Sequence, residues 1–352
     1  MPRLPQGKQG FTMLRRIVQT GWWLAALPYG AAAAQSTPAT VNIYRYILSV
    51  DVPESPAFVA LGVAPTHVLR GSAPKPITVA IIDAFPGGNQ PAPGVALDVA
   101  PYFLAGGGVR RVTRWRSMSL GGRLTRVLAK TILSVGAVRD PGDAGSALVG
   151  LALRSAVHDP HDPLLNSSLP ADIAAEQARR EISDTITADD VSGSGVDLAP
   201  LFARARAAMR GRSGDAQIAL GWGVGGRLHG SVLTSDSLDP VRHTLWLSGQ
   251  YTAGPRLDIL ATVQVRSAFR SDVRLWIGAA VQRKTAAVDY RAELYYDTRS
   301  HDGHPGVAVE ARVLPHLGLV AALASQPVDF AGTGPRRLAV RTVLHWFYAS
   351  DR

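Results

Sequence analysis

The chain has 352 residues, of which 46% are hydrophobic, with 37 Lys and Arg against 27 Asp and Glu and no Cys. The absence of Cys excludes disulfide staples and thiolate metal sites, and it suits an exported chain. A net charge of +10 raises the question of nucleic acid. However, the basic residues are spread through the sequence rather than clustered on one helix or arm, and we predict no nucleic-acid partner.

Residues 1–34 have the pattern of a secretory signal peptide. Arg15 and Arg16 precede an apolar run from Trp22 to Tyr29, and an alanine run ends before Gln35; these are the basic, apolar and small-residue regions of such a signal. The alternative is an uncleaved membrane anchor, which Pro28 and the short apolar run disfavour. We predict cleavage of this segment, export, and a location in the outer membrane of a Gram-negative-type bacterium.

Residues 35–76 are rich in Pro and Ala and break any strand pattern. We expect this segment to be non-strand. It is either a periplasmic lead-in or a plug tucked into the structure that follows it.

From residue 77 onward the sequence alternates between apolar and polar residues. In Leu257–Arg266 the apolar side chains occupy every second position, which only a β-strand sorts onto one face. We predict an all-β fold, a transmembrane antiparallel β-barrel of about 12 strands over residues 77–352 with a short helical insertion. The predicted strands are 77–85, 95–104, 124–138, 146–157, 216–231, 241–252, 257–267, 273–283, 286–298, 306–314, 317–325 and 337–348.

Two long interruptions fall on one side of this barrel if connections alternate between its ends. The first covers residues 105–123 and the second residues 159–215. The second contains two stretches of good helix formers, 171–183 and 199–210. These helices could plug the pore, cap its mouth or dock a periplasmic partner, or they could form a solvated excursion.

The charged face of each strand must point inward, because Arg or Lys facing lipid at the bilayer midplane costs about 2–4 kcal/mol. Gly221, Gly223 and Gly225 share one strand face, where glycine relieves crowding in a narrow barrel. Trp246 and Trp276 fall on the inward face, either packed against a plug or across a narrow lumen, or forming a stacking platform for a ligand such as a sugar. We predict that the lumen is lined by Arg126, Lys130, Arg154, Arg227, Arg242, Asp258, Arg266, Arg274, Asp289, Arg291, Glu293, Glu310, Arg312 and Arg341.

The string Ser55-Pro56-Ala57-Phe58, followed by Leu61-Gly62, resembles the opening of a group of uncharacterised bacterial outer-membrane proteins. In that group a similar stretch precedes the first strand, and the resemblance extends over residues 50–155. The aromatic run Leu344–Tyr348 resembles the C-terminal signature that barrel-assembly machinery recognises. These resemblances imply an outer-membrane barrel whose partners are membrane lipid, lipopolysaccharide and the assembly machinery, with no activity assigned to the group.

No catalytic, metal or cofactor motif stands out in the sequence. The His158–Pro163 and Ser300–Pro305 stretches combine His, Asp and Pro in the manner of loops. The favoured function is a channel or transporter for small solutes, leaning toward anions because of the inward arginines. One alternative is a barrel enzyme acting on lipid or surface polymer at an outer-rim cluster of Ser, His and Asp. The other is a non-conducting structural or export-partner barrel.

Overall fold

The structure is a computed structural model of the chain. It describes residues 54–71, 75–83, 93–104, 119–140, 143, 145–160, 168–186, 201, 204–205, 214–229, 238–268, 273–285, 288–314, 317–327 and 336–348. The predicted signal peptide and the first part of the Pro/Ala-rich segment lie outside these residues, as does most of the predicted helix at 199–210.

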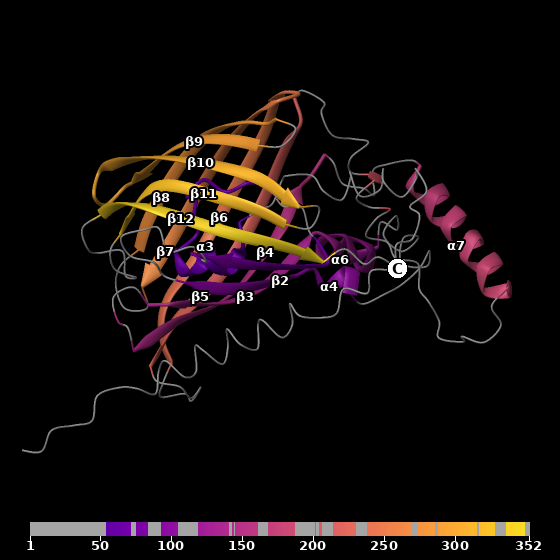
Figure 1. Cartoon of the computed structure of the whole chain (residues 1–352), viewed down its shortest axis with the longest axis horizontal. Coiled ribbons are helices and arrows are strands. Elements are labelled where there is room, and N and C mark those ends of the chain that lie inside the picture. Colours follow the sequence, from indigo (N-terminus) through magenta and orange to yellow (C-terminus); the bar gives the residue numbers. More distant parts are fainter. Residues whose placement is uncertain are drawn as a thin grey trace, which may run out of the picture.

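In this part of the chain, twelve antiparallel strands form one closed barrel in which β1 pairs with β12 (Figure 1). The predicted all-β barrel is therefore confirmed, and each strand pairs with its neighbours in sequence. The strands are β1 (Ile77–Ile82), β2 (Gly94–Val99), β3 (Thr131–Arg139), β4 (Ser146–His158), β5 (Ala216–His229), β6 (Leu238–Gly254), β7 (Leu257–Ala268), β8 (Val273–Arg283), β9 (Val288–Asp297), β10 (Asp302–Leu314), β11 (Leu317–Pro327) and β12 (Arg336–Tyr348).

Because the strand number is even, β1 begins and β12 ends at the same end of the barrel, which we call the proximal end. The chain makes its long excursions there. Helices α4 (Pro101–Leu104) and α6 (Leu120–Ala129) lie between β2 and β3, and α7 (Leu169–Ile186) lies between β4 and β5. Figure 1 shows α7 standing apart from the barrel wall. No helix in the described ranges is long and apolar enough to cross a membrane.

The predicted strand at 124–138 was wrong in its first half. Residues up to Ala129 form helix α6, which begins where the Ser119 side chain accepts a hydrogen bond from the Gly122 amide at 3.2 Å. Its apolar residues recur at helical rather than strand spacing. Arg126 and Lys130 therefore do not lie on a barrel strand, and their assignment to the lumen wall is corrected: Arg126 is within α6 and Lys130 is its C-cap.

Two further boundaries differ from the prediction. The strand expected at 95–104 ends at Val99, and the residues after Ala100 form α4, whose first residue is Pro101; proline suits the first turn of a helix because it lacks an amide hydrogen. The external loop expected at 299–305 is shorter, because β10 already begins at Asp302. His301 makes the turn with a φ of 56°.

Burial alternates along the strands, so the barrel has an apolar outside and a largely polar inside. Exposed outward residues include Leu97, Leu151, Ile277 and Leu294, whereas Arg154 and Gln282 are fully enclosed. A wall that presents leucine and isoleucine to its surroundings and pairs its strands into a closed ring is the one that suits lipid. The fold is thus that of a transmembrane barrel.

A short helix lies inside the barrel. Helix α3 (Pro56–Leu61) follows Ser55 and ends at Gly62, which adopts a left-handed φ of 70° that glycine accepts without strain. Every residue from 54 to 71 is buried except Gly62. We call residues 54–71 the plug, with a helical half (55–62) and an extended half (66–71).

Candidate functional site: the plugged lumen

The helical half of the plug packs mainly through apolar contacts. Phe58, Val59 and Leu61 are at most 1% exposed and belong to a hydrophobic cluster that includes wall residues from both sides of the barrel. Full burial of such side chains stabilises by about 1.5–3 kcal/mol each. Polar contacts fix the start of the helix: the Ser55 hydroxyl donates to Asp98 at 2.7 Å, and the Ala57 amide donates to the Ser134 hydroxyl at 2.9 Å.

Glycines in the wall make room for this helix. A Cβ atom at Gly223 would lie 2.5 Å from the Cβ of Ala60, and one at Gly150 would lie 2.9 Å from Leu61. Gly136 stands in the same relation to Ala57. The wall is therefore shaped to the helix at the level of single methyl groups, which is the packing of a protein core.

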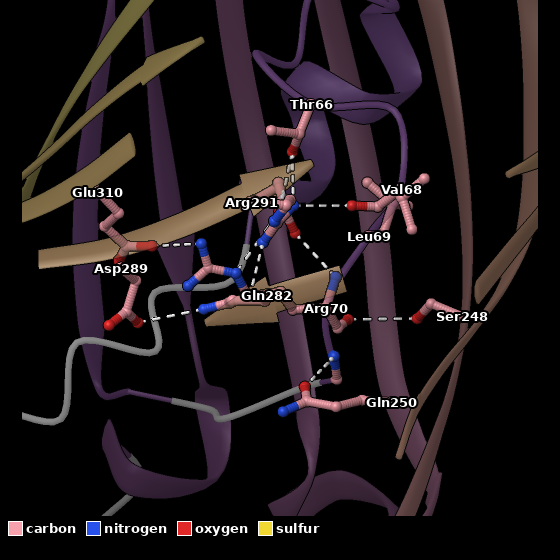
Figure 2. A network of polar contacts seen from close by, with 12 residues as sticks. Thr66, Val68, Leu69, Arg70, Ser248, Gln250, Gln282, Asp289, Arg291 and Glu310 are labelled. Atoms are coloured by element: carbon pink, nitrogen blue, oxygen red, sulfur yellow. Dashed lines mark hydrogen bonds and ion pairs between the residues drawn. The ribbon is translucent and has the colours of Figure 1, made fainter. Parts of the chain in front are cut away.

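The extended half shares some of this apolar packing, because Leu69 belongs to the same cluster and Val68 packs against Leu260 and Ala280. What distinguishes it is its backbone, which forms no β-ladder with the wall; side chains satisfy its peptide groups instead. Thr262 accepts from the Leu69 amide at 2.7 Å, Gln264 donates to the carbonyl of plug residue 67 at 2.8 Å, and Glu293 accepts from the two amides at 67 and 68. Figure 2 shows Arg291 and Ser248 donating to further carbonyls of this half.

Glu54 is the centre of a buried ionic network at the start of the plug. Its carboxylate lies 2.8 Å from Arg291 Nη1 and accepts from the Thr66 hydroxyl at 2.9 Å, while Arg70 pairs with Glu310. Glu54 belongs to the plug and not to a strand. Burial raises the pKa of Glu54, but three arginines, Arg291 foremost, outweigh this and lower the pKa to about 2.

Arg154 ties the two ends of the plug together. Its guanidinium donates to the carbonyl of Gly71 at 2.7 Å and, at 3.4 Å, to that of Glu54. The side chain is fully buried. One strand residue therefore fixes both the point where the plug begins and the point where it ends.

The residues predicted to line the lumen fall into three groups. Arg154, Arg242, Arg291, Glu293 and Glu310 contact the plug. Others form contacts along the wall, and these are Asp258 with Lys284, Asp289 with Gln282, Arg227 with Asp140, Arg341 with Asp83, and Arg266 with Gln264. Arg274 occupies an inward register position on β8, and the side chain of Arg312 lies outside the described set.

Both inward tryptophans are packed. Trp246 lies over Gly221, where a Cβ atom would approach its ring to 2.2 Å, and it is 1% exposed. Trp276 stacks on Tyr295 at 5.6 Å between centroids, and the Arg266 guanidinium lies 3.8 Å from its ring centre. The plug residue His67 also faces Trp276 and Tyr295. In this closed arrangement neither indole presents a free stacking face.

Sequence reasoning did not single out the plug residues that matter most, Glu54, Thr66, His67 and Arg70. A signal was present, because Glu54 and Arg70 bracket an apolar stretch in a segment that has no strand pattern. The inward glycines were a second signal. Three glycines on one face of a strand indicated crowding, although not what would cause it.

A serine and a histidine meet near the distal end, where β3 turns into β4 and β5 ends. Ser146 Oγ lies 3.1 Å from His229 Nδ1 and 2.5 Å from Asp143 Oδ2. Asp143 is a better acceptor for the hydroxyl than His229, so the serine proton is directed to the carboxylate and the histidine does not serve it as a base. Gly145 and Ser146 both donate to Asp143, the pattern of a turn. In the residues described, no group of three or more His, Cys, Asp or Glu could hold a metal ion.

The fold defines a transmembrane β-barrel of the outer-membrane type, with a plug in its lumen. No protein-family model and no curated protein matches the sequence. Solved structures of similar shape include the "KdgM porin in complex with disordered oligogalacturonate" (7% identity, TM-score 0.39, 78% of this chain and 99% of that one). Others are the "CymD monoaromatic hydrocarbon channel" (9%, 0.36, 85% and 98%) and the Acinetobacter baumannii outer membrane protein Omp33 (6%, 0.32, 77% and 96%). The similarity to these structures is loose.

Proposed function

We propose that this chain is an outer-membrane channel or transporter for small solutes whose resting lumen is closed by the plug. The observation that carries the proposal is the contrast in the lumen: beside the apolar packing of Val68 and Leu69, the peptide groups of the extended half are held by polar side chains that water or a polar solute could replace. Movement of residues 66–71 alone would open a path along β6–β10 and leave α3 in place. The proximal end then faces the periplasm, in agreement with an exported chain whose signal peptide has been removed.

The anion preference belongs to the open form. In the closed form Arg154 and Arg291 are engaged with plug carbonyls and with Glu54. When the extended half leaves, Arg291 faces the path together with the carboxylates of Glu293 and Glu310. Arginine is suited to carboxylate and phosphate groups, so we propose that a solute with an anionic group binds at Arg291, within a lining of mixed charge.

A reversible lock tests the proposal. The chain has no Cys, so Val68→Cys with Gly278→Cys introduces the only thiol pair, between plug and wall, at a point where Val68 Cγ2 lies 2.8 Å from the position of a Cβ atom at Gly278, within reach of a disulfide. In planar bilayers, the reduced protein should show openings that disappear on oxidation and return on reduction. Leu151→Cys with Val224→Cys, a cross-strand pair outside the lumen, is the matched control and should conduct equally in both states.

One alternative has an observation of its own. The close fit of α3 against wall glycines is what a permanent core would show, and it favours a non-conducting structural barrel. A structural barrel predicts no conductance from the double-cysteine variant when its disulfide is reduced. It also predicts none after residues 66–71 are replaced by a Gly/Ser linker of equal length. Conductance from the linker variant with none from the native chain would instead identify a plug that needs a further trigger.

A further inference from the structure

We infer that helix α6 is an interfacial helix that inserts its apolar stripe into the periplasmic leaflet of the membrane that surrounds the barrel. The stripe consists of Leu120, Leu124, Val127 and Leu128, which are 84%, 59%, 51% and 48% exposed. Their spacing along the chain places them on one side of the helix. The choice of leaflet rests on the orientation proposed above; insertion of the stripe into lipid rests on the fold and stands whether or not the barrel conducts.

The opposite side of the helix is already occupied. Gly122 and Ala129 are buried, and α6 packs against α4 and the end of β4. The apolar stripe is therefore not a face that turned outward because the helix is loosely held. It is the face left over after the helix has docked onto the barrel.

The position of the docked helix points the stripe toward lipid. The carbonyl of Val127 accepts hydrogen bonds from Thr131 at 2.7 Å and from Ser155 at 3.4 Å. Both hydroxyls lie at strand positions that face outward, because the residues next to them in the chain, Ile132 and Arg154, are the buried, inward-facing ones. The last turn of α6 thus lies against the outer side of the wall at the proximal end, and not across the mouth of the lumen.

The stripe continues the lipid-facing surface of the barrel. Leu133, Leu153 and Val157 are outward residues of β3 and β4 near the same end, exposed at 43%, 37% and 65%. A lipid surface covers all of these residues at once, whereas a protein partner would have to follow the edge of the bilayer. The helix also carries two arginines and no acidic residue, which suits phosphate headgroups. Such a helix buries its apolar face by about 5–10 Å at the headgroup boundary.

The absence of Cys allows a single-site test. Leu124→Cys, labelled with a polarity-sensitive fluorophore, is refolded in phosphatidylethanolamine/phosphatidylglycerol vesicles with or without lipids that carry a nitroxide near the headgroup. Ala175→Cys on α7, an exposed position on a helix at the same end, is the aqueous control. Leu151→Cys on β4 is the lipid-facing control. A difference in gel mobility between heated and unheated samples shows beforehand that each labelled barrel has folded.

The expected result is a blue-shifted Leu124 label that loses most of its intensity to the lipid nitroxide, as the Leu151 label does, and is protected from aqueous iodide. The Ala175 label should be quenched by iodide alone. The inference is overturned if the Leu124 label behaves like the Ala175 label. It is equally overturned if the Leu124 label is protected from both quenchers, because a second copy or another protein would then cover the stripe.

Discussion

The two halves of the plug fill the same lumen but are held by different kinds of contact. The helical half presents methyl and phenyl groups to glycines and small residues, and it forms part of an apolar core. The extended half buries only Val68 and Leu69 in apolar clusters and presents its peptide groups to hydroxyl, amide and charged side chains. Water cannot replace the close apolar packing of the helical half. Water can replace a hydrogen-bonding partner of the extended half at a modest net cost in free energy. The difference indicates which half can move without unfolding the barrel.

The largest effect is expected from Glu54→Gln. Removal of this carboxylate leaves the Arg291 side chain buried without its counter-ion, and breaking a buried ion pair in this way costs about 3–5 kcal/mol. Urea unfolding of the barrel in vesicles should show this loss, together with more frequent opening in bilayers. Glu54→Gln combined with Arg291→Met should recover part of the stability; a double variant that only adds two losses would show that the pair is not coupled.

Acidification should weaken the same network without a mutation. The folded pKa of Glu54, about 2, lies below the ordinary value. A carboxyl with a lowered pKa stabilises the fold fully above its unfolded pKa of about 4.3 and loses this contribution as pH falls toward the folded value. Stability of the native chain should thus drop between about pH 4 and pH 2 more than that of Glu54→Gln. Parallel curves for the two proteins in this range would contradict the assignment.

Overpacking of the helical half should have a smaller effect on stability and little effect on opening. Gly223→Val places a branched side chain where a Cβ atom alone would meet Ala60 at 2.5 Å, and such overpacking costs about 1–3 kcal/mol. Gly254→Ala, with no atom within 4 Å of the added Cβ, is the control and should unfold as the native chain does. If Gly223→Val raised the opening frequency more than Glu54→Gln did, the helical half and not the extended half would be the part of the plug that moves.

An effect no larger than that of Gly223→Val is expected from loss of a single hydrogen bond of the extended half. Thr262→Val leaves the buried Leu69 amide without its acceptor, at a cost of about 1–3 kcal/mol, and should raise the opening frequency measurably. Thr262→Ser keeps the hydroxyl and should restore the native frequency. Equal behaviour of the valine and serine variants would mean that this contact does not hold the plug.

The barrel was predictable because its signal is local and repeated. Period-two alternation identifies a strand within ten residues, and the cost of charge in lipid then decides which face points inward. The prediction extended the strand pattern of 131–138 back over residues 124–130 and so missed the helical spacing of Leu124, Val127 and Leu128. The Ser119 cap and the packing against α4 agree with that spacing.

The plug could not be derived in the same way. Its extended half has no ladder and no period, and the residues that fix it come from strands far along the chain. From the sequence, residues 35–76 were equally consistent with a lead-in outside the barrel. The sequence does contain the glycines that make room for the plug, such as Gly150 and Gly223. These glycines indicate crowding in the lumen, but they do not identify the segment that fills it.

The placement of Glu54 and Arg70 has a consequence for how the molecule is assembled. Glu54 meets Arg291, 237 positions later, and Arg70 meets Glu310, 240 positions later. The plug precedes every strand in the chain, yet its partners are spread over the whole barrel, and β1 cannot pair with β12 until the last strand has arrived. Such long-range contacts make folding slow. The plug would then act as a template around which the sheet curls, so that closure of the barrel and filling of its lumen are one event.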